Sequence, residues 1–259
     1  MNDAVKKNIE NRFGNASSSY NKYADVQKES ALRLGKALAP WLGILPRGPI
    51  LEIGCGTGFL TRHLVNLLPK RQFEITDLSE KMLQQCKKEI GDVDHITYNQ
   101  LDAEKETPER QYAMVAHNFV AQWFKDPPYT LEKYLDIIEP GGLLLGAFPG
   151  ENSFPQWKRM CKKLSLPFTG NILPNAEEMA VKLSLGPCKV DFHEDMITQS
   201  FDHALQFFKM LQTIGAHTKF NPDSLTTAEL KKLIRYWDAE SPHAIHVDWH
   251  IIFLAVKKN

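Results

Sequence analysis

The segment at residues 50–60 constrains the fold of this chain more than any other part of it. It reads ILEIGCGTGFL, a short apolar run that leads into glycines at positions 54, 56 and 58. The apolar run predicts a buried strand. The glycines predict a sharp turn whose backbone a ligand can touch, because no Cβ stands in the way. Leucines at positions 60, 64, 67 and 68 predict a helix at residues 59–68, and the amino terminus of that helix offers unpaired N–H groups to an anion.

The alternation of strand and helix continues along the chain. Ser79 is the expected cap of the next helix, and a helix at residues 131–138 is expected to stop at the Pro-Gly-Gly sequence of residues 140–142. Strands are expected at residues 50–54, 73–76, 95–98, 112–116, 143–148, 189–198 and 249–256. Such alternation predicts an α/β fold, in which a mostly parallel sheet carries helices on both faces. Ligands of such sheets bind at the carboxyl ends of the strands.

The pattern changes beyond Pro149. Helical stretches near residues 154–164, 176–185, 202–214 and 226–237 have few strands between them to cover. We therefore expect these helices to form a lid over the open end of the sheet. The predicted organisation is one domain over residues 1–259, with amino-terminal helices at 1–42, a cofactor-binding core at 43–149, and lid helices at 150–186 and 200–247.

The glycine spacing distinguishes two kinds of nucleotide-binding turn. NAD-dependent enzymes carry GxGxxG, which cradles a pyrophosphate. Residues 54–58 read GxGxG instead, and this spacing resembles the first motif of class I S-adenosylmethionine-dependent methyltransferases, where the anion is the cofactor's methionine carboxylate. The resemblance implies a Rossmann-like fold with a seven-stranded sheet. It also makes an NAD-dependent oxidoreductase the less favoured interpretation.

The same resemblance implies a set of cofactor-binding residues. Asp77 ends the second expected strand, 23 residues after Gly54, near the spacing of a carboxylate that accepts hydrogen bonds from ribose hydroxyls; a helix-capping aspartate is the alternative. Asp102 is placed to accept from the adenine amino group and Met82 to lie against the ring, with a surface aspartate and a core methionine as alternatives. The residues implied to bind the cofactor are Gln27, Glu52, Gly54, Cys55, Gly56, Gly58, Asp77, Leu78, Met82, Asp102, Ala103, Asn118 and Phe119.

Four further segments narrow the class. They are RFGNASSSYNKYADVQ at residues 12–27, Gln122-Trp123, NILPNAEEM at residues 171–179, and ALQFFKMLQTIGAH at residues 204–217. Together they resemble the malonyl-acyl carrier protein O-methyltransferases of biotin synthesis, over nearly the whole chain. One departure is Asn15, which stands where the family pattern leads us to expect a basic residue after Phe-Gly.

The reaction implied by this resemblance is transfer of a methyl group to the free carboxylate of a malonyl thioester on acyl carrier protein. A carboxylate with a pKa near 4 is already ionised at pH 7, so no general base is required. The protein has to align the reacting atoms and exclude water. Tyr20 and Trp123 are the expected catalytic residues, although a structural role is an open alternative for both. We expect His117 to have a structural or polar-contact role rather than to act as a base.

Charge and composition limit the possible partners. Lys and Arg together number 31, as do Asp and Glu, which gives no global footprint for nucleic acid. Acyl carrier protein is acidic, so a docking face is expected on a helix that carries Lys158, Arg159, Lys162 and Lys163; a solvated helix face is the alternative. Arg33 and the lid lysines are candidates to neutralise the acceptor carboxylate, with nothing in the sequence to choose between them.

Other features exclude several classes of protein. The four cysteines form no CxxC pair, so no disulfide framework or metal site is expected. The apolar runs are shorter than the roughly 20 residues that span a bilayer, and the amino terminus lacks the apolar stretch of a secretory signal, so we expect a cytoplasmic protein without membrane association. Two alternatives stay open: a methyltransferase of another small carboxylic acid or of a quinone precursor, and a non-catalytic protein that binds S-adenosylmethionine as a scaffold.

Overall fold

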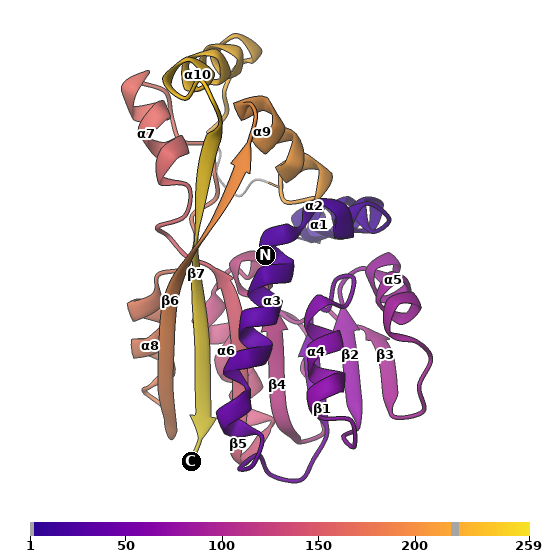
Figure 1. The fold of residues 1–259 in the computed structure, drawn as a ribbon. Coiled ribbons are helices and arrows are strands. Elements are labelled where there is room, and N and C mark those ends of the chain that lie inside the picture. Colours follow the sequence, from indigo (N-terminus) through magenta and orange to yellow (C-terminus); the bar gives the residue numbers. More distant parts are fainter. Residues whose placement is uncertain (1–2, 219–222) are drawn as a thin grey trace.

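A seven-stranded sheet forms the centre of the molecule (Figure 1). The computed structural model describes residues 3–218 and 223–259. The strands are β1 (Ile50–Ile53), β2 (Phe73–Asp77), β3 (Ile96–Gln100), β4 (Tyr112–Asn118), β5 (Ile138–Pro149), β6 (Cys188–Phe201) and β7 (Ile245–Lys258). The helices are α1 (Asp3–Ala16), α2 (Tyr20–Tyr23), α3 (Asp25–Ala37), α4 (Phe59–Leu67), α5 (Glu80–Ile90), α6 (Pro127–Asp136), α7 (Pro155–Lys163), α8 (Ala176–Leu183), α9 (Ala204–Thr213) and α10 (Thr227–Glu240), and short 3-10 helices cover Ala39–Trp41 and Ala121–Trp123.

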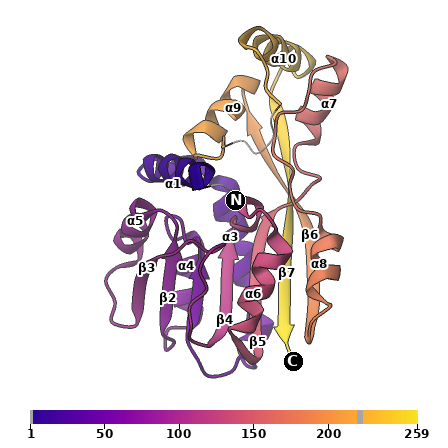
Figure 2. The same ribbon diagram turned by 180° about the vertical axis from the view of Figure 1, so that it is seen from behind.

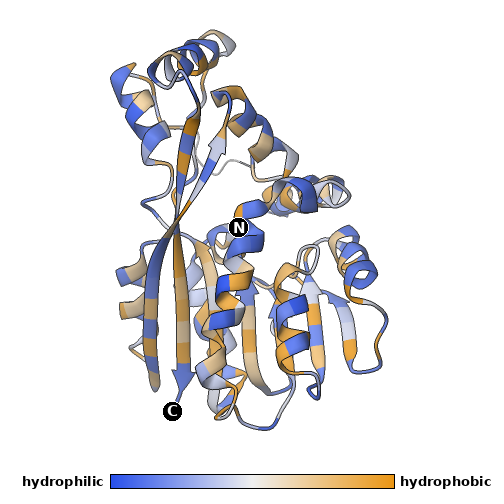
Figure 3. Ribbon diagram, viewed as in Figure 1, coloured by the Kyte–Doolittle hydropathy of each residue, from blue (hydrophilic) through white to orange (hydrophobic). Residues whose placement is uncertain are grey.

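The strand order is β3-β2-β1-β4-β5-β7-β6, and β7 is the one strand that runs opposite to all the others in this sheet of described residues. The prediction of a mostly parallel sheet with helices on both faces is therefore confirmed. All four residues of β1 are buried, as expected for a continuous apolar run that is covered on both sides. One apolar core joins the sheet to α3, α4 and α5, and another joins it to α6 and α8. Figure 3 shows the apolar strands between helices whose outer faces are hydrophilic.

The Pro-Gly-Gly sequence of residues 140–142 does not end a helix as predicted. Helix α6 ends earlier, at Asp136, and β5 already begins at Ile138. The pairing between β4 and β5 shifts from Tyr112↔Ile138 to Met114↔Leu143, so the two glycines lie in an irregular part of the strand. Gly141 has a φ of +77°, which a glycine adopts without strain. The sequence signal for a break was real, but it marks a bulge inside the strand.

Helix α8 corrects the predicted extent of the lid. It was expected in the lid with the rest of residues 150–186, but it packs beside α6 on the face of the sheet (Figure 2). Its buried residues Ala176, Met179 and Leu183 belong to the same core as residues of β5 and β7. The long strand β6 supplies the surface that α8 covers, and our prediction underestimated the length of that strand.

Helices α7, α9 and α10 surround the far ends of β6 and β7, beyond the rest of the sheet (Figures 1 and 2). They pack through aromatic rings, with Trp157 and Phe208 at 5.2 Å and Phe207 and Trp237 at 5.9 Å between ring centroids. We call α7, α9 and α10 the helical cluster. Residues 219–222 of the predicted lid range 200–247, and residues 1–2 of the predicted range 1–42, lie outside the described residues.

Helices α1 and α2 lie across the carboxyl ends of β1 and β2 (Figure 1). This is the edge of the sheet at which the sequence predicts a ligand. Among the residues that the structure describes, no helix is both long and apolar enough to cross a membrane, and no group of three metal-binding side chains comes together.

Candidate active site

The three glycines of the turn after β1 serve different purposes. All have positive φ: +65° at Gly54, +55° at Gly56 and +94° at Gly58. A Cβ on Gly54 would lie 2.3 Å from Cγ2 of Val120, whereas a Cβ on Gly56 would meet nothing within 4 Å. Gly54 therefore allows close packing, and Gly56 presents bare backbone to open space. These are the properties that the sequence predicts for a turn that holds a ligand.

Gly58, unlike Gly56, is enclosed by neighbouring side chains. It is the residue before α4, and a Cβ at this position would lie 3.0 Å from the sulfur of Cys86 on α5. It is absent from the lining of the cavity beside the turn. Its glycine is required by the backbone conformation and by the packing of α4 on α5, which a local sequence pattern cannot distinguish from ligand contact.

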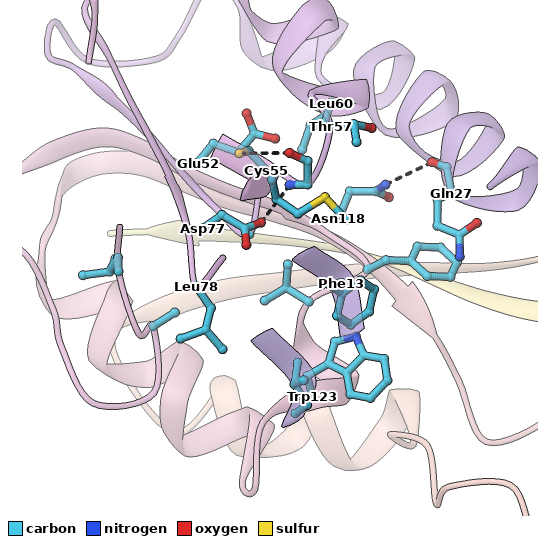
Figure 4. A pocket seen from close by; sticks show the side chains of 18 of the residues that line it. Phe13, Gln27, Glu52, Cys55, Thr57, Leu60, Asp77, Leu78, Asn118 and Trp123 are labelled. Carbon is cyan, nitrogen blue, oxygen red and sulfur yellow. Dashed lines mark hydrogen bonds between the residues drawn. The ribbon is translucent and has the colours of Figure 1, made fainter. Parts of the chain in front are cut away.

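A cavity opens between the glycine turn, the ends of β2 and β4, and helix α1 (Figure 4). Apart from Gly58, every predicted cofactor-binding residue lines it, and so do Tyr20 and Trp123. Other lining residues were not predicted from the sequence, among them Lys6, Ile9, Phe13, Thr57, Leu60 and Glu104. Phe13 lies in the RFG segment that carries the family resemblance, which could have indicated it; no sequence pattern marked Lys6.

Asp77 is fixed by the backbone at the end of β2. Its Oδ2 accepts a hydrogen bond from the Gly56 N–H at 2.9 Å, and its Oδ1 accepts one from the Ser79 N–H at 2.8 Å. Burial raises the pKa of Asp77 to about 6, although backbone N–H groups oppose the shift. Ser79 occupies the predicted cap position of α5, but its side chain makes no capping bond. Asp77 thus both faces the cavity and ties the glycine turn to the start of α5.

Glu52 is a buried carboxyl group with unused bonding capacity. Its side chain is 1% exposed, and its Oε2 has no hydrogen-bond partner among the described residues. Burial raises its pKa to about 8; hydrogen bonds with Thr61 oppose the shift and the charge of Asp77 adds to it. A buried acceptor without a partner is costly unless a ligand completes it. Since Glu52 lines the cavity, the group that fits beside it is a cation such as an amino acid's ammonium.

Asp102 faces the cavity from the loop after β3 and is not an ordinary surface aspartate. Lys6 of α1 donates to both of its carboxylate oxygens, at 2.6 and 2.8 Å, and also pairs with Glu104 at 2.9 Å. The Lys6 side chain is 9% exposed. The far end of the cavity is therefore walled by two carboxylates and one ammonium, brought together from distant parts of the chain.

Backbone strain occurs where β4 ends. Asn118 donates to the Gln27 carbonyl at 3.0 Å and accepts from Ser30 at 2.8 Å, so it is held against α3. The next residue, Phe119, has a φ of +60°, a left-handed conformation that is rare for an aromatic residue. Its side chain nevertheless lines the cavity. Strain of this kind collects at functional sites, where the surrounding structure enforces it.

Aromatic rings close the cavity on the side of α1 and α2. Phe13 lies edge-on to Trp123 with ring centroids 5.3 Å apart (Figure 4). The ring centroids of Tyr20 and Phe59 are 6.1 Å apart. Tyr20 is 8% exposed, and burial raises the pKa of its hydroxyl, so the group is neutral. These rings form an uncharged wall from which water can be excluded.

A second cavity adjoins the first on the side of the helical cluster. The two share Phe13, Tyr20, Gln27, Phe119 and Trp123 in their linings. The rest of the second cavity is lined mainly by residues of the helical cluster and its loops, for example Trp157, Asn171, Gln212 and His217. Gln122 of the 3-10 helix after β4, Pro149 of β5 and Trp249 of β7 complete the lining. The shared aromatic residues therefore stand where a group bound in one cavity would meet a group bound in the other.

Comparison with known proteins identifies the family. Residues 51–144 match the family model described as a methyltransferase domain. The chain is 32% identical to a malonyl-[acyl-carrier protein] O-methyltransferase of Priestia megaterium over 225 residues, which cover 82% of this chain and 81% of that protein. The chain belongs to the malonyl-acyl carrier protein O-methyltransferase family. The family predicted from the sequence is thus confirmed.

Other relatives agree over a larger share of the chain. The protein of the same description from Magnetococcus marinus is 29% identical over 254 residues, covering 97% of this chain and 91% of the relative. Among solved structures, the YcgJ protein from Bacillus subtilis matches with a TM-score of 0.60 at 12% identity, covering 88% of this chain and 98% of that one. A phosphoethanolamine N-methyltransferase of Haemonchus contortus in complex with S-adenosyl-L-methionine matches with a TM-score of 0.52 at 18% identity. The match covers 87% of this chain and 52% of that one. These structures support the fold.

Two other candidates from the sequence lie away from both cavities. His117 is fully buried beneath Phe148, and burial lowers its pKa to about 4. It lines neither cavity, in keeping with a family reaction that needs no base. Arg33 also lines neither cavity; it pairs with Glu29 at 2.7 Å and with Asp195. The structure thus removes Arg33 as a candidate for neutralising the acceptor carboxylate.

The basic stripe on α7 is partly engaged by neighbouring groups. Lys158 donates to the Glu151 carbonyl and lies over the ring of Phe168, and Lys163 pairs with Glu240. Arg159 and Lys162 are exposed and have no ion-pair partner within 4 Å in the described part of the chain. A smaller positive surface than predicted is therefore available to a partner.

Proposed function

We propose that this chain transfers a methyl group from S-adenosylmethionine to the free carboxylate of malonyl-acyl carrier protein, giving the malonyl methyl ester that primes pimeloyl formation in biotin synthesis. The observation that carries the proposal is the pair of cavities that meet at Phe13, Tyr20, Gln27, Phe119 and Trp123. One cavity has the glycine turn expected for the cofactor. The other is formed with the helical cluster, whose sequence carries part of the family resemblance.

The residues of the first cavity fit the cofactor. The bare backbone at Gly56 suits its carboxylate, the unpaired Glu52 oxygen suits its ammonium, and Asp77 is placed to accept from the ribose hydroxyls. Leu78, Met82 and Ala103 supply apolar contacts, and Asp102 can accept from the adenine amino group. The cofactor, when bound, supplies a methyl group that is activated by a positively charged sulfur.

The chain's own contribution to the reaction is binding and orientation. The malonyl carboxylate is ionised at neutral pH and needs no base. Tyr20, Trp123, Phe13 and Phe119 are placed to hold the acceptor in line with the methyl carbon and to exclude water. The faces of these rings can also attract the positive sulfur. The carboxylate oxygen forms the new bond to carbon, the carbon–sulfur bond breaks with its electrons left on sulfur, and no proton is transferred.

The helical cluster is the proposed lid, and the carrier protein is proposed to dock beside it. Arg159 and Lys162 are the exposed cations of the α7 stripe that have no ion-pair partner within 4 Å among the described residues, and Trp157 of the same helix lines the acceptor cavity. Docking at α7 would therefore place the arm of the carrier protein close to the second cavity.

Mass spectrometry of malonyl carrier protein after incubation with the protein and S-adenosylmethionine tests the function. We expect the malonyl arm to gain the mass of one methyl group, and free malonate to be a much poorer acceptor. Equal use of free malonate or of another small acid would favour the broader carboxyl methyltransferase. Cofactor binding without transfer to any acceptor would favour a scaffold.

A further inference from the structure

Helix α1 is fastened to the loop after β3 at the far end of the cofactor cavity. Lys6 contacts Asp102 and Glu104 there, and the exposed Lys105 pairs with Asp3 of the same helix at 2.6 Å. Lys6 and Ile9 also line the cavity, so α1 forms one of its walls. The two ion pairs connect the same elements, but only the pair formed by Lys6 is buried.

The contacts of Lys6 hold the Asp102 carboxylate in one orientation. Oδ1 accepts from Lys6 at 2.6 Å and from the Glu104 N–H at 3.1 Å. Oδ2 accepts from Lys6 at 2.8 Å and from no other group in the described part of the chain, which leaves it a lone pair. Without the ammonium, the carboxylates of Asp102 and Glu104 would repel each other in a poorly solvated place.

We propose that Lys6 is a positioning residue for cofactor recognition: it orients Asp102 toward the adenine amino group and fastens α1 over the bound cofactor. This inference rests on the proposed function, because it takes the cavity to hold S-adenosylmethionine. Cofactor exchange then requires the Lys6 ion pairs to break, since α1 is part of the cavity wall. Adenine selectivity and cofactor release depend on the same side chain.

Binding of S-adenosylhomocysteine tests the inference without turnover. Calorimetry gives its Kd, and stopped-flow fluorescence of the tryptophans gives its dissociation rate. S-inosylhomocysteine, in which a carbonyl oxygen replaces the adenine amino group, is the matched ligand. The variants are Lys6→Met, Lys6→Gln and Lys6→Arg, with Lys105→Met as the control that breaks the exposed ion pair between the same elements. Circular dichroism identifies any variant that fails to fold, and the second neutral variant then replaces it.

Lys6→Met and Lys6→Gln are expected to weaken S-adenosylhomocysteine binding by about 10- to 100-fold, the effect of losing one charge-assisted hydrogen bond. Dissociation of both ligands should accelerate because α1 is no longer fastened, but the affinity for the inosine analogue should fall much less than that for S-adenosylhomocysteine, so the preference for adenine shrinks. Lys6→Arg should restore most of that preference. The Kd of Lys105→Met for S-adenosylhomocysteine should stay within about threefold of that of the original protein, because an exposed ion pair contributes little free energy. A merely structural role would weaken both ligands equally.

Unchanged or tighter S-adenosylhomocysteine binding in the neutral Lys6 variants would overturn the inference, as would an equal loss for both ligands. In contrast, failure of the unaltered protein to bind S-adenosylhomocysteine at all would overturn the proposed function. The two failures are therefore distinguishable in the same set of titrations.

Discussion

Replacing Glu52 by Gln should make the protein more stable and a poorer binder of its cofactor. The pKa of Glu52 is raised from 4.5 to about 8 in the folded protein, so the native state holds a proton that the unfolded chain releases above pH 4.5. Each pH unit above 4.5 costs about 1.4 kcal/mol of stability until the native group also ionises. At pH 7 this cost is about 3 kcal/mol, and at pH 5 it is below about 1 kcal/mol. Gln has nearly the same shape and carries no such cost.

Urea unfolding of the original protein and of Glu52→Gln at pH 5, 7 and 8, without cofactor, measures this difference. Because the pKa of Glu52 is raised, the contribution of Glu52 to stability is most favourable at low pH and falls as the pH rises toward 8, and the variant should lack this decline. The increase in the free energy of unfolding that the substitution causes should therefore grow with pH.

Calorimetry on the same samples should show the opposite effect on function. The Oε2 of Glu52 has no partner among the described residues and is the proposed acceptor for the cofactor's ammonium. Loss of a hydrogen bond to a charged group should weaken S-adenosylhomocysteine binding by about tenfold or more. A variant that is less stable at every pH, or one that binds the cofactor as tightly as the original, would refute this reasoning.

Predictions for three further variants follow from the geometry of the site and of α7. Asp77→Asn replaces an acceptor of two backbone hydrogen bonds by a group with one acceptor oxygen. The Kd for S-adenosylhomocysteine, measured by calorimetry, should therefore rise by about 10- to 100-fold. An unchanged Kd would argue against ribose recognition by this residue. Gly54→Ala places a Cβ 2.3 Å from Val120 at positive φ, so chemical denaturation should show a loss of about 2 kcal/mol or more; a smaller loss would mean that the turn can relax. The double variant Arg159→Glu and Lys162→Glu should raise the KM for malonyl carrier protein in steady-state assays and leave the KM for malonyl-pantetheine unchanged. If the variant and the original protein have the same KM for the carrier protein, α7 is excluded as the docking site.

Much of the cofactor cavity could be predicted because its residues follow strand ends. Glu52, Asp77 and Asn118 lie at or near the carboxyl ends of β1, β2 and β4, and parallel strands bring these ends to one edge of the sheet. Gly58 shows the limit of the argument, because a glycine can be required by backbone conformation and packing alone. Asp102 lines the cavity, but its ammonium partner could not be foreseen, since Lys6 lies 96 residues away in the sequence.

The sequence by itself determined the strand, turn and helix at residues 50–68 and the alternation that builds the parallel sheet. These features depend on local requirements: apolar side chains in a buried strand, and glycines where φ is positive. Only the tertiary structure decided that α8 covers the sheet, that Arg33 lines neither cavity, and that Lys6 pairs with Asp102. Such contacts join residues far apart in the chain, and they depend on how whole elements pack rather than on any local pattern.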